Sequence, residues 1–296
     1  MEKKIVSAIL LIVALSLCAQ APGKPEIKSL TNCWGNIASE VTEIITEILV
    51  YNPNPFSIPL KDILTEIYMN ELKMGEGKAL KAEIPPGESE IILSTEIKNN
   101  RIPEWFVSHI KNGEKTDVKL KGYLVFDLRL TEFKYPFEQS STIKTNLLSE
   151  LKSQAPKTVS VGPMTFTIKS INAYWGKVEK DYTEIIIIAT ISNENPISVL
   201  IPKYKYYMEM NGIKVASGIN DLVALIPPMS EASLTFVIKI ENEMLDEWFV
   251  SHLKNKERSE IKIVIEPFIE ISGKEISFVL IESKSYMETK ILGCWR

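Results

Sequence analysis

The chain contains one ordered series of short motifs twice, and this duplication constrains its fold more than any other feature of the sequence. Trp34-Gly35 returns as Trp175-Gly176, and the hexapeptide Glu104–His109 returns as Glu247–His252, with Ile84-Pro85-Pro86 also repeated between them. A constant order with a drift of two residues in the spacing indicates two copies of one structural unit that differ by small loop insertions. The 296 residues also exceed what one hydrophobic core usually organises.

The local patterns within each copy predict a mainly β fold. Residues 43–51 are rich in Ile, Val and Thr, and residues 118–121 alternate between apolar and charged side chains, which is typical of strands. Asn211-Gly212 between apolar flanks predicts a hairpin, and Asn70-Glu71 occupies the same place in the first copy. Pro103 at the start and Asn112-Gly113 at the end predict one short α-helix around the repeated Trp.

The sequence therefore predicts two tandem antiparallel β-sandwiches, each with one short α-helix. We expect the first domain over residues 25–147 and the second over residues 158–296, with a linker at residues 148–157. Domain boundaries are the part of such a prediction that depends most on the exact course of the loops.

The N-terminus has the pattern of an export signal. Charged residues 2–4 precede an apolar run over residues 5–17, which is shorter than the roughly 20 residues of a membrane span. Residues 1–18 predict a lipoprotein signal with lipid on Cys18, followed by a tether at residues 19–24. The alternatives are cleavage after Ala21, which would secrete the protein, or an uncleaved anchor. We expect an exported protein held at the outer face of the cytoplasmic membrane.

Composition excludes one class of protein and disfavours two others. The chain has 34 Lys and Arg against 38 Asp and Glu, with no basic tract, so nucleic acid is not an expected partner. A hydrophobic content of 45% excludes an intrinsically disordered stress protein. Only 2 His and 3 Cys are present, which leaves few residues for nucleophilic, acid–base or metal chemistry. We therefore expect no enzyme and no cofactor.

The residues that most resemble a functional site have a structural explanation. His109 and His252 occupy equivalent helix positions in separate copies, and no motif places a nucleophile or a third metal ligand beside either. The aromatic residues of the two helices, Trp105, Phe106, Trp248 and Phe249, are expected in the core rather than in an exposed binding stripe. The acidic segment at residues 241–247 lacks the spacing of a calcium loop, so we predict a solvated surface and no metal site.

Cys33 and Cys294 remain as an even pair once Cys18 is assigned to lipid. In an exported protein such a pair predicts a disulfide, which would join the first strand region to the end of the chain. The alternative is two buried thiols in separate domains. The sequence leaves both open, because it does not show whether the two Cα atoms lie within about 7 Å.

A strand that ends in Asn52-Pro53-Asn54 gives the chain its resemblance to a known family. The tripeptide is the hallmark of the WHy (water stress and hypersensitive response) domain, and the chain resembles a prokaryotic, archaeal member of this late embryogenesis abundant (LEA_2) family. The second copy keeps Asn193 and Asn195 but has Glu194 in place of the proline. The resemblance implies immunoglobulin-like or fibronectin-III-like sandwiches and a role in desiccation, without catalytic residues. Physically, the asparagines are expected to satisfy backbone groups at a sheet corner, with ligand recognition as the alternative.

These observations predict a non-catalytic, membrane-tethered protein that protects other proteins during water stress or binds them. The alternative is a cell-surface adhesion or scaffold module that recognises one protein partner. An enzyme is a third possibility that would require a concave site with convergent titratable groups. The clients or partner are not identified by the sequence.

Overall fold

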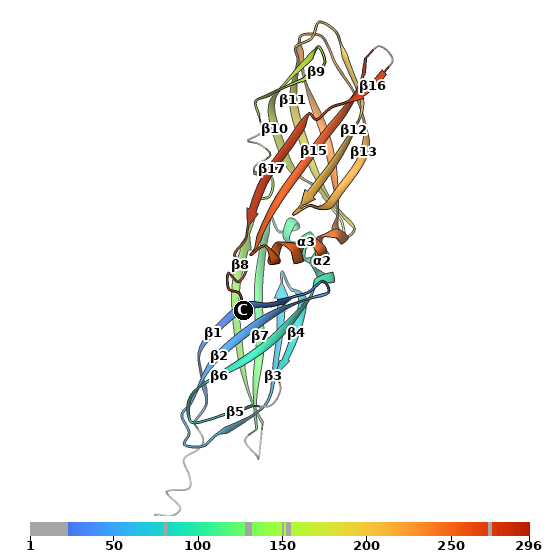
Figure 1. Cartoon of the computed structure of the whole chain (residues 1–296). Helices are drawn as coiled ribbons and strands as arrows, with labels where there is room; N and C mark the ends of the chain where they lie inside the picture. Colours follow the sequence, from blue (N-terminus) through green and yellow to red (C-terminus); the bar gives the residue numbers. More distant parts are fainter. Residues whose placement is uncertain (1–22, 80–81, 128–131, 150, 152–154, 272–273) are drawn as a thin grey trace, which may run out of the picture.

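The protein was analysed as a computed structural model, which describes residues 23–79, 82–127, 132–149, 151, 155–271 and 274–296. Figure 1 shows an elongated molecule in which two strand-rich units lie end to end, with two helices between them. The predicted signal at residues 1–18, its lipidation candidate Cys18 and most of the tether lie outside the described residues. Among the residues that are described, no helix has the length and apolar character needed to cross a membrane.

The first unit contains eight strands, one 3-10 turn and one helix. They are β1 (Glu26–Ile37), β2 (Val41–Asn52), β3 (Ile58–Met69), β4 (Leu72–Ala79), β5 (Ala82–Ile84), β6 (Gly87–Lys98), η1 (Asn99–Arg101), α2 (Ile102–Lys111), β7 (Lys115–Asp127) and β8 (Glu132–Lys144). These strands form one antiparallel sheet in the order β1-β2-β6-β4-β3-β7-β8, with β5 paired to β3.

The second unit repeats this plan with one additional strand at its start. Its elements are β9 (Lys157–Val161), β10 (Met164–Val178), β11 (Tyr182–Asn193), β12 (Val199–Met210), β13 (Ile213–Ile226), β14 (Ser230–Glu241), η3 (Asn242–Met244), α3 (Leu245–Lys254), β15 (Arg258–Ile271), β16 (Lys274–Ser277) and β17 (Ile281–Glu288). One sheet has the order β14-β11-β10-β9, and the other has the order β13-β12-β15-β16, with β17 paired to β15. The mainly β class with one short helix per unit is thus confirmed.

A methyl group and a buried tyrosine, both present only in the second unit, distinguish the two sheets of that unit from the single sheet of the first. Gly75 of β4 pairs with Ile97 of β6, and a Cβ at Gly75 would lie 1.8 Å from the Glu96 carbonyl oxygen. The second unit has Ala216 at this position, so β13 does not pair with β14. The buried Tyr204 fills the gap, because its hydroxyl donates to the Val237 carbonyl and accepts from the Val237 amide.

The predicted turns are present, but one insertion lies where the sequence comparison did not place it. Asn70-Glu71 and Asn211-Gly212 each form a hairpin with positive φ at both residues. One extra residue of the second copy does lie in a turn, at Met229. The other is a β-bulge in the middle of β13, at residues 222–223, where three steps along β13 match two along β12. The interpretation of the drift as loop insertions alone was therefore wrong for this residue.

One hydrophobic core crosses from the first unit into the second. A single cluster of buried residues contains Trp34, Trp105 and Phe106 from the first unit together with Trp248 and Phe249 from the second. A smaller cluster, built around Phe126, Ile48 and Leu60, fills the far end of the first unit. The repeated aromatic residues are core residues, as the sequence predicts, but they belong to the junction between the units.

Candidate functional site at the junction of the two units

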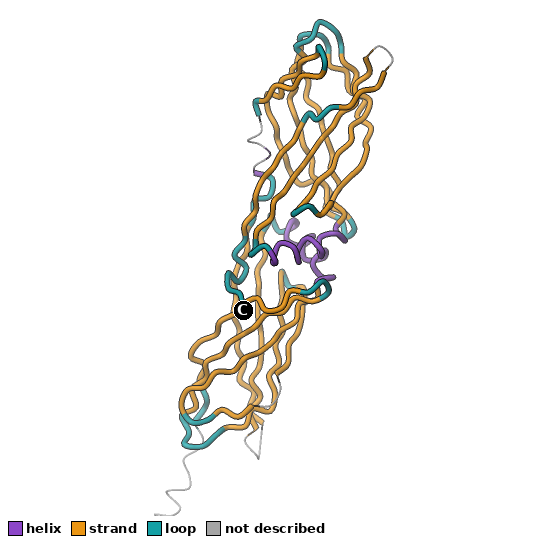
Figure 2. The backbone as a smooth tube through the Cα atoms, in the orientation of Figure 1, coloured by secondary structure: helices purple, strands orange, loops and turns teal. Residues whose placement is uncertain are grey.

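The two repeated helices meet at the junction and make matching aromatic contacts in both directions. Figure 2 shows the helices lying together between the two sets of strands. Trp34 of β1 lies edge-on to Phe249 of α3, with 6.3 Å between ring centroids. The equivalent pair in the opposite direction is Trp175 of β10 and Phe106 of α2, at 6.2 Å. Each unit therefore presents the same surface to the other, which is the pattern of an isologous interface.

Two buried or half-buried glutamates strengthen this reciprocal contact. Glu257, which is 2% exposed, accepts a hydrogen bond from the Trp34 indole N–H at 2.7 Å. Glu114, at the equivalent place in the first unit, accepts one from the Trp175 indole N–H at 2.9 Å. Each carboxylate also accepts from the chain segment that follows the last strand of its own unit. Each glutamate therefore joins both units.

The glutamates are directed into the junction by an unusual backbone conformation. Glu114 and Glu257 both have φ of 58°, in the left-handed region that residues with a Cβ seldom adopt. Each follows the end of a helix, after Gly113 in the first unit and after Lys256 in the second, whose φ is also 58°. Such a conformation costs about 1 kcal/mol or more and persists where surrounding contacts enforce it. Here the enforcing contacts are the hydrogen bonds to the carboxylates.

A continuous chain of hydrogen bonds leads from each helix to each glutamate. In the second unit the Trp248 indole N–H donates to Ser259, whose hydroxyl lies 2.8 Å from His252 Nδ1. His252 Nε2 lies 2.8 Å from the Thr289 hydroxyl, which donates to Glu257. Because Thr289 gives its proton to the carboxylate, it accepts from Nε2–H, and Nδ1 accepts from Ser259. A neutral His252 therefore satisfies every group in the chain.

The first unit contains the same chain with a threonine in place of the serine. Trp105 donates to Thr116, which lies 2.7 Å from His109 Nδ1, and Thr145 connects His109 Nε2 to Glu114. Burial lowers the pKa of His109 and of His252 to about 4, while the adjacent glutamate opposes the shift. Both imidazoles are neutral at pH 7.

This arrangement does not have the properties of a catalytic site. Ser259 and His252 resemble a nucleophile and its base, but both are buried, and the serine oxygen already accepts the Trp248 N–H. The equivalent Thr116 is fully buried as well. The cavity between the two helices, lined by both histidines, has a volume of only about 20 Å³. The histidines act as internal hydrogen-bond links, in agreement with the structural interpretation of their duplication.

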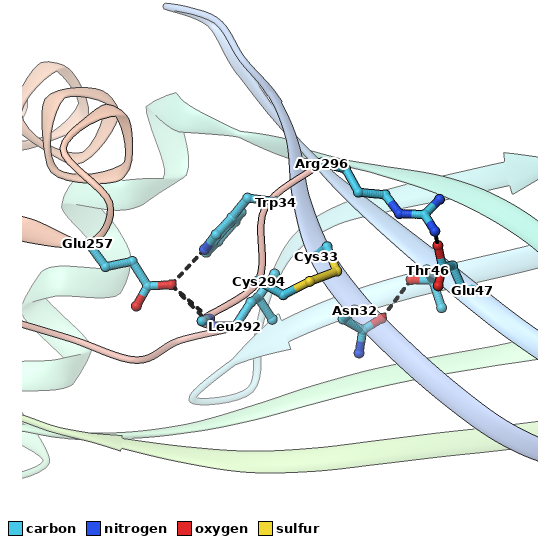
Figure 3. The surroundings of a disulfide bond; sticks show 10 residues. Asn32, Cys33, Trp34, Thr46, Glu47, Glu257, Leu292, Cys294 and Arg296 are labelled. Carbon is cyan, nitrogen blue, oxygen red and sulfur yellow. Dashed lines mark hydrogen bonds and ion pairs between the residues drawn. A yellow bond between two sulfur atoms is a disulfide. The ribbon is translucent and has the colours of Figure 1, made fainter.

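The cysteine pair closes the junction on its outer side. Figure 3 shows the disulfide between Cys33 and Cys294, whose Cα atoms are 4.5 Å apart. The last residues run beside β1, since the Trp34 amide donates to the Cys294 carbonyl and the Arg296 amide donates to the Trp34 carbonyl. Arg296 also forms an ion pair with Glu47 of β2. The end of the second unit is thus attached to the first strand of the first unit.

The repeated asparagines lie at the two far ends of the molecule and form equivalent networks. Asn52 donates to the Phe56 and Ile84 carbonyls, and its side-chain oxygen accepts from the Asn54 amide. Asn193 and Asn195 repeat these contacts in the second unit. Asn54 binds both the N–H and the carbonyl of Gly23. These bonds support the interpretation of the motif as a sheet corner. The second unit retains the bonds of its two asparagines although Glu194 stands in place of the proline.

The remaining candidates are not brought together into a site. Glu241, Glu243 and Glu247 are exposed, and within the described residues no three acidic, His or Cys side chains form a group that could hold a metal. Sequence reasoning missed Glu114 and Glu257, although the self-comparison contains the signal. Both are glutamates that follow the repeated helix, and each lies at the same distance along the chain from the first residue of its repeated hexapeptide.

Comparison with known proteins identifies the first unit. A model of the late embryogenesis abundant (LEA_2) family matches residues 47–141, from β2 to β8. The chain is a LEA_2-like protein. An uncharacterised protein of Methanocaldococcus jannaschii is 24% identical over 162 residues, which are 51% of this chain and 90% of that protein.

Two solved structures are also similar to part of the chain. A protein from Archaeoglobus fulgidus is 35% identical, with a TM-score of 0.41, over 42% of this chain and 99% of its own. A protein from Arabidopsis thaliana is 17% identical, with a TM-score of 0.32, over 43% of this chain and 84% of its own. The family assignment therefore stands on the LEA_2 match and implies a stress-related or binding role.

Proposed function

We propose that this LEA_2-like protein is a non-catalytic protein that protects other proteins during water stress from a position outside the cytoplasmic membrane. The observation that carries the proposal is the match of residues 47–141 to the LEA_2 family. The junction adds support, because its histidines, serine and glutamates are committed to internal hydrogen bonds, and the cavity that the histidines line has a volume of only about 20 Å³.

The proposed location is the outer face of the membrane, with lipid on Cys18 or an uncleaved signal as the anchor. The disulfide between Cys33 and Cys294 supports export, because such bonds persist in oxidising compartments. Gly23 lies at the free end of the first unit, so a tether would leave the second unit pointing away from the membrane. Fractionation of cells that express the protein tests this proposal. Cys18→Ser is expected to move the protein out of the membrane fraction, and unchanged membrane association would exclude lipidation.

The protective function is tested by drying a labile client enzyme with the two-unit protein and measuring recovered activity. An equal mass of an inert globular protein is the control for nonspecific crowding. Recovery clearly above the control at low molar ratio is the expected result. Recovery equal to the control would exclude general protection.

A second candidate function is binding of one specific protein partner, as an adhesion or scaffold module. Exposed apolar side chains on the second unit favour it, since isolated proteins seldom keep such side chains together on their surface. Capture of one partner in a fixed stoichiometry from membrane extracts, with no protection of unrelated clients, is the result expected for this alternative.

A further inference from the structure

Five exposed apolar residues gather on β12, β13 and the turn that follows. We call them the apolar face: Leu200, Ile219, Val223, Leu225 and Met229, with exposed fractions of 40%, 61%, 75%, 59% and 72%. Leu200 and Leu225 are cross-strand neighbours. Ile219, Val223 and Leu225 all point outward from β13. The structure thus exposes apolar surface that folding of the unit leaves uncovered.

The first unit shows that the fold does not require an apolar surface here. The pair Leu200 and Leu225 is replaced by Pro59 and Glu83 in the same register. Ile219, opposite Lys205, corresponds to Lys78, opposite Leu64. The same corner of the first unit therefore has Pro59, Lys78 and Glu83 in place of Leu200, Ile219 and Leu225, with Leu64 as an exposed apolar residue beside them.

The two single-residue insertions that distinguish the second unit both lie in this face. Between the position of Ile219 and that of Ala224 the second unit has one extra residue, which forms the bulge at residues 222–223. The turn before β14 has one more extra residue, Met229. Val223 and Met229 are more exposed than the other residues of the face. Each insertion thus adds a prominent apolar side chain.

Both inserted residues also adopt strained backbone conformations. Val223 has φ of 45° and Met229 has φ of 47°. Positive φ is unfavourable for any residue with a Cβ and is rare for a β-branched one. Glycine would fit both positions without strain, and the first unit does have Gly87, with φ of 87°, in the equivalent turn. The presence of Val223 and Met229 at positions that favour glycine therefore points to a use of their side chains outside folding.

The charges around the face define the kind of partner that it fits. Asp221 is exposed on β13 between Ile219 and Val223, and Glu194 is exposed in the adjacent loop. Two lysines of β12 also border the face: Lys203, across from Asp221, and Lys205, across from Ile219. They form ion pairs with Glu275 at 3.0 Å and with Glu266 at 3.1 Å, so their charges are compensated and Asp221 and Glu194 leave the surroundings of the face acidic. An anionic lipid surface would be repelled, whereas a partner with basic residues around an apolar centre would be attracted.

The edge of the sheet indicates the conformation of that partner. β13 is the terminal strand of its sheet, with β12 as its neighbour. Asn220 of β13 donates to the Val237 carbonyl of β14, so the edge that stays unpaired among the described residues is that of residues 221–226. A terminal strand can accept an extended peptide as a further strand, and alternate side chains of that peptide then meet one face. We propose that the apolar face binds extended, apolar polypeptide segments flanked by Lys or Arg, as partly unfolded client proteins expose them. This proposal rests on the protective function above and names the surface and the ligand that it uses.

The face lies at the end of the molecule far from Gly23. Gly23 is bonded to Asn54, which follows β2 at the end of the first unit away from the helices, whereas Figure 1 shows β12 and β13 running to the opposite end of the molecule. A membrane-tethered molecule would therefore present the face toward clients in the surrounding solution. The disulfide and the continuous junction core hold the two ends apart.

The experiment measures binding of two labelled peptides to the whole protein by fluorescence anisotropy. The first peptide alternates Val and Ile with Thr and carries Lys at both ends, and the second has the same centre with Glu at both ends. The test variant is Ile219→Lys, Val223→Gly, Leu225→Glu and Met229→Gly combined. The Lys and Glu are the residues that the first unit has at these positions, and the two glycines relieve backbone strain. We therefore expect this variant to fold. Ile92→Thr is the matched control, because it removes an exposed apolar residue elsewhere and installs the second unit's Thr235.

We expect the Lys-flanked peptide to bind the native protein and the control equally, and to bind the four-residue variant at least about tenfold more weakly. Asp221→Asn, a single surface change, is expected to weaken binding of this peptide severalfold at low salt and to strengthen binding of the Glu-flanked peptide, which the carboxylate repels. Equal binding of the two peptides by the native protein would overturn the assignment. No binding of either, or loss of binding in the control alone, would do the same.

Two further measurements separate the ligands. Binding to phosphatidylglycerol vesicles, or self-association in light scattering, that is abolished in the four-residue variant would replace the peptide with lipid or with a second copy. The peptide result is independent of the drying assay. A native protein that protects clients but does not bind the peptide refutes this inference alone, and one that binds the peptide but does not protect refutes the proposed function alone.

Discussion

Replacement of Glu257 by glutamine is expected to destabilise the protein more than the same change at Glu114. Glu257 accepts from the Trp34 indole, the Thr289 hydroxyl and the amides of residues 291, 292 and 293. Glutamine would replace one oxygen by an NH₂ group, which donates and does not accept. Its best orientation places the NH₂ where Oε2 was, and it still leaves the Ile291 amide without an acceptor.

The magnitude follows from the donors that lose their partner. A hydrogen bond to a charged group contributes about 1.5–3 kcal/mol, and a buried donor left unpaired costs about 1–3 kcal/mol. We therefore expect Glu257→Gln to lower the free energy of unfolding by about 2–4 kcal/mol. In Glu114→Gln the best orientation places the NH₂ group at the Trp175 indole, so only this N–H loses its acceptor. Because Trp175 is half-buried, its N–H can bond to water instead, and we expect the free energy of unfolding to fall by about 1 kcal/mol.

Urea unfolding, followed by tryptophan fluorescence and far-ultraviolet circular dichroism, measures both variants against the native protein. The midpoint is expected to fall while the slope with urea stays constant, because the change in exposed surface is the same. The double variant measures the coupling between the two glutamates. An effect of Glu257→Gln equal to or smaller than that of Glu114→Gln would refute the reasoning, because the count of donors would then not determine stability.

Three further perturbations have expected outcomes. Reduction of the disulfide between Cys33 and Cys294, which are 261 positions apart, should lower the free energy of unfolding by up to about 5 kcal/mol. Calorimetry with and without reductant measures this loss. The variant with serine at both positions should not respond to reductant. Stability should fall as the pH drops from 6.5 to about 4, because the histidines of the unfolded chain then bind protons that the buried His109 and His252 of the folded chain do not. The expected loss is roughly 3 kcal/mol per histidine. An NMR titration of the imidazoles that gave pKa values near 6.5 would contradict this expectation. Gly75→Ala should separate β4 from β6 and cost several kcal/mol, visible as lost amide protection along β6, whereas glycine at the equivalent alanine should cost roughly 1 kcal/mol at most.

The features that the sequence predicted are those that depend on near neighbours in the chain. Strands follow from alternation and β-branched residues, and the hairpin at Asn211-Gly212 follows from two residues that tolerate positive φ. The helix around Trp105 follows from Pro103 and its apolar period. Because each copy repeats these signals, every local prediction is made twice.

The junction could not be derived in the same way, because its contacts join segments far apart in the sequence. Trp34 and Glu257 are separated by 223 positions, and no local pattern assigns one to the other. Sequence reasoning placed the repeated aromatics in the core, and the structure adds that this core is one that the two units share. The bulge at Val223 was also missed, since a single extra residue in a strand looks the same in an alignment as one in a loop.

The duplication separates the residues that build the molecule from those that specialise it. Both units contain the hydrogen-bond chain, through His109 in the first and through His252 in the second. Each chain ends at a glutamate that also accepts a hydrogen bond from a tryptophan of the other unit. What is not shared lies on the outside of the junction or beyond it. Cys33 corresponds to Tyr174, and only the first unit forms a disulfide with the segment that contains Cys294. A peptide linker crosses the junction in one direction and the disulfide crosses it in the other. Two crossings prevent the units from separating, so the exposed residues that the second unit alone carries can be specialised for binding without weakening the junction.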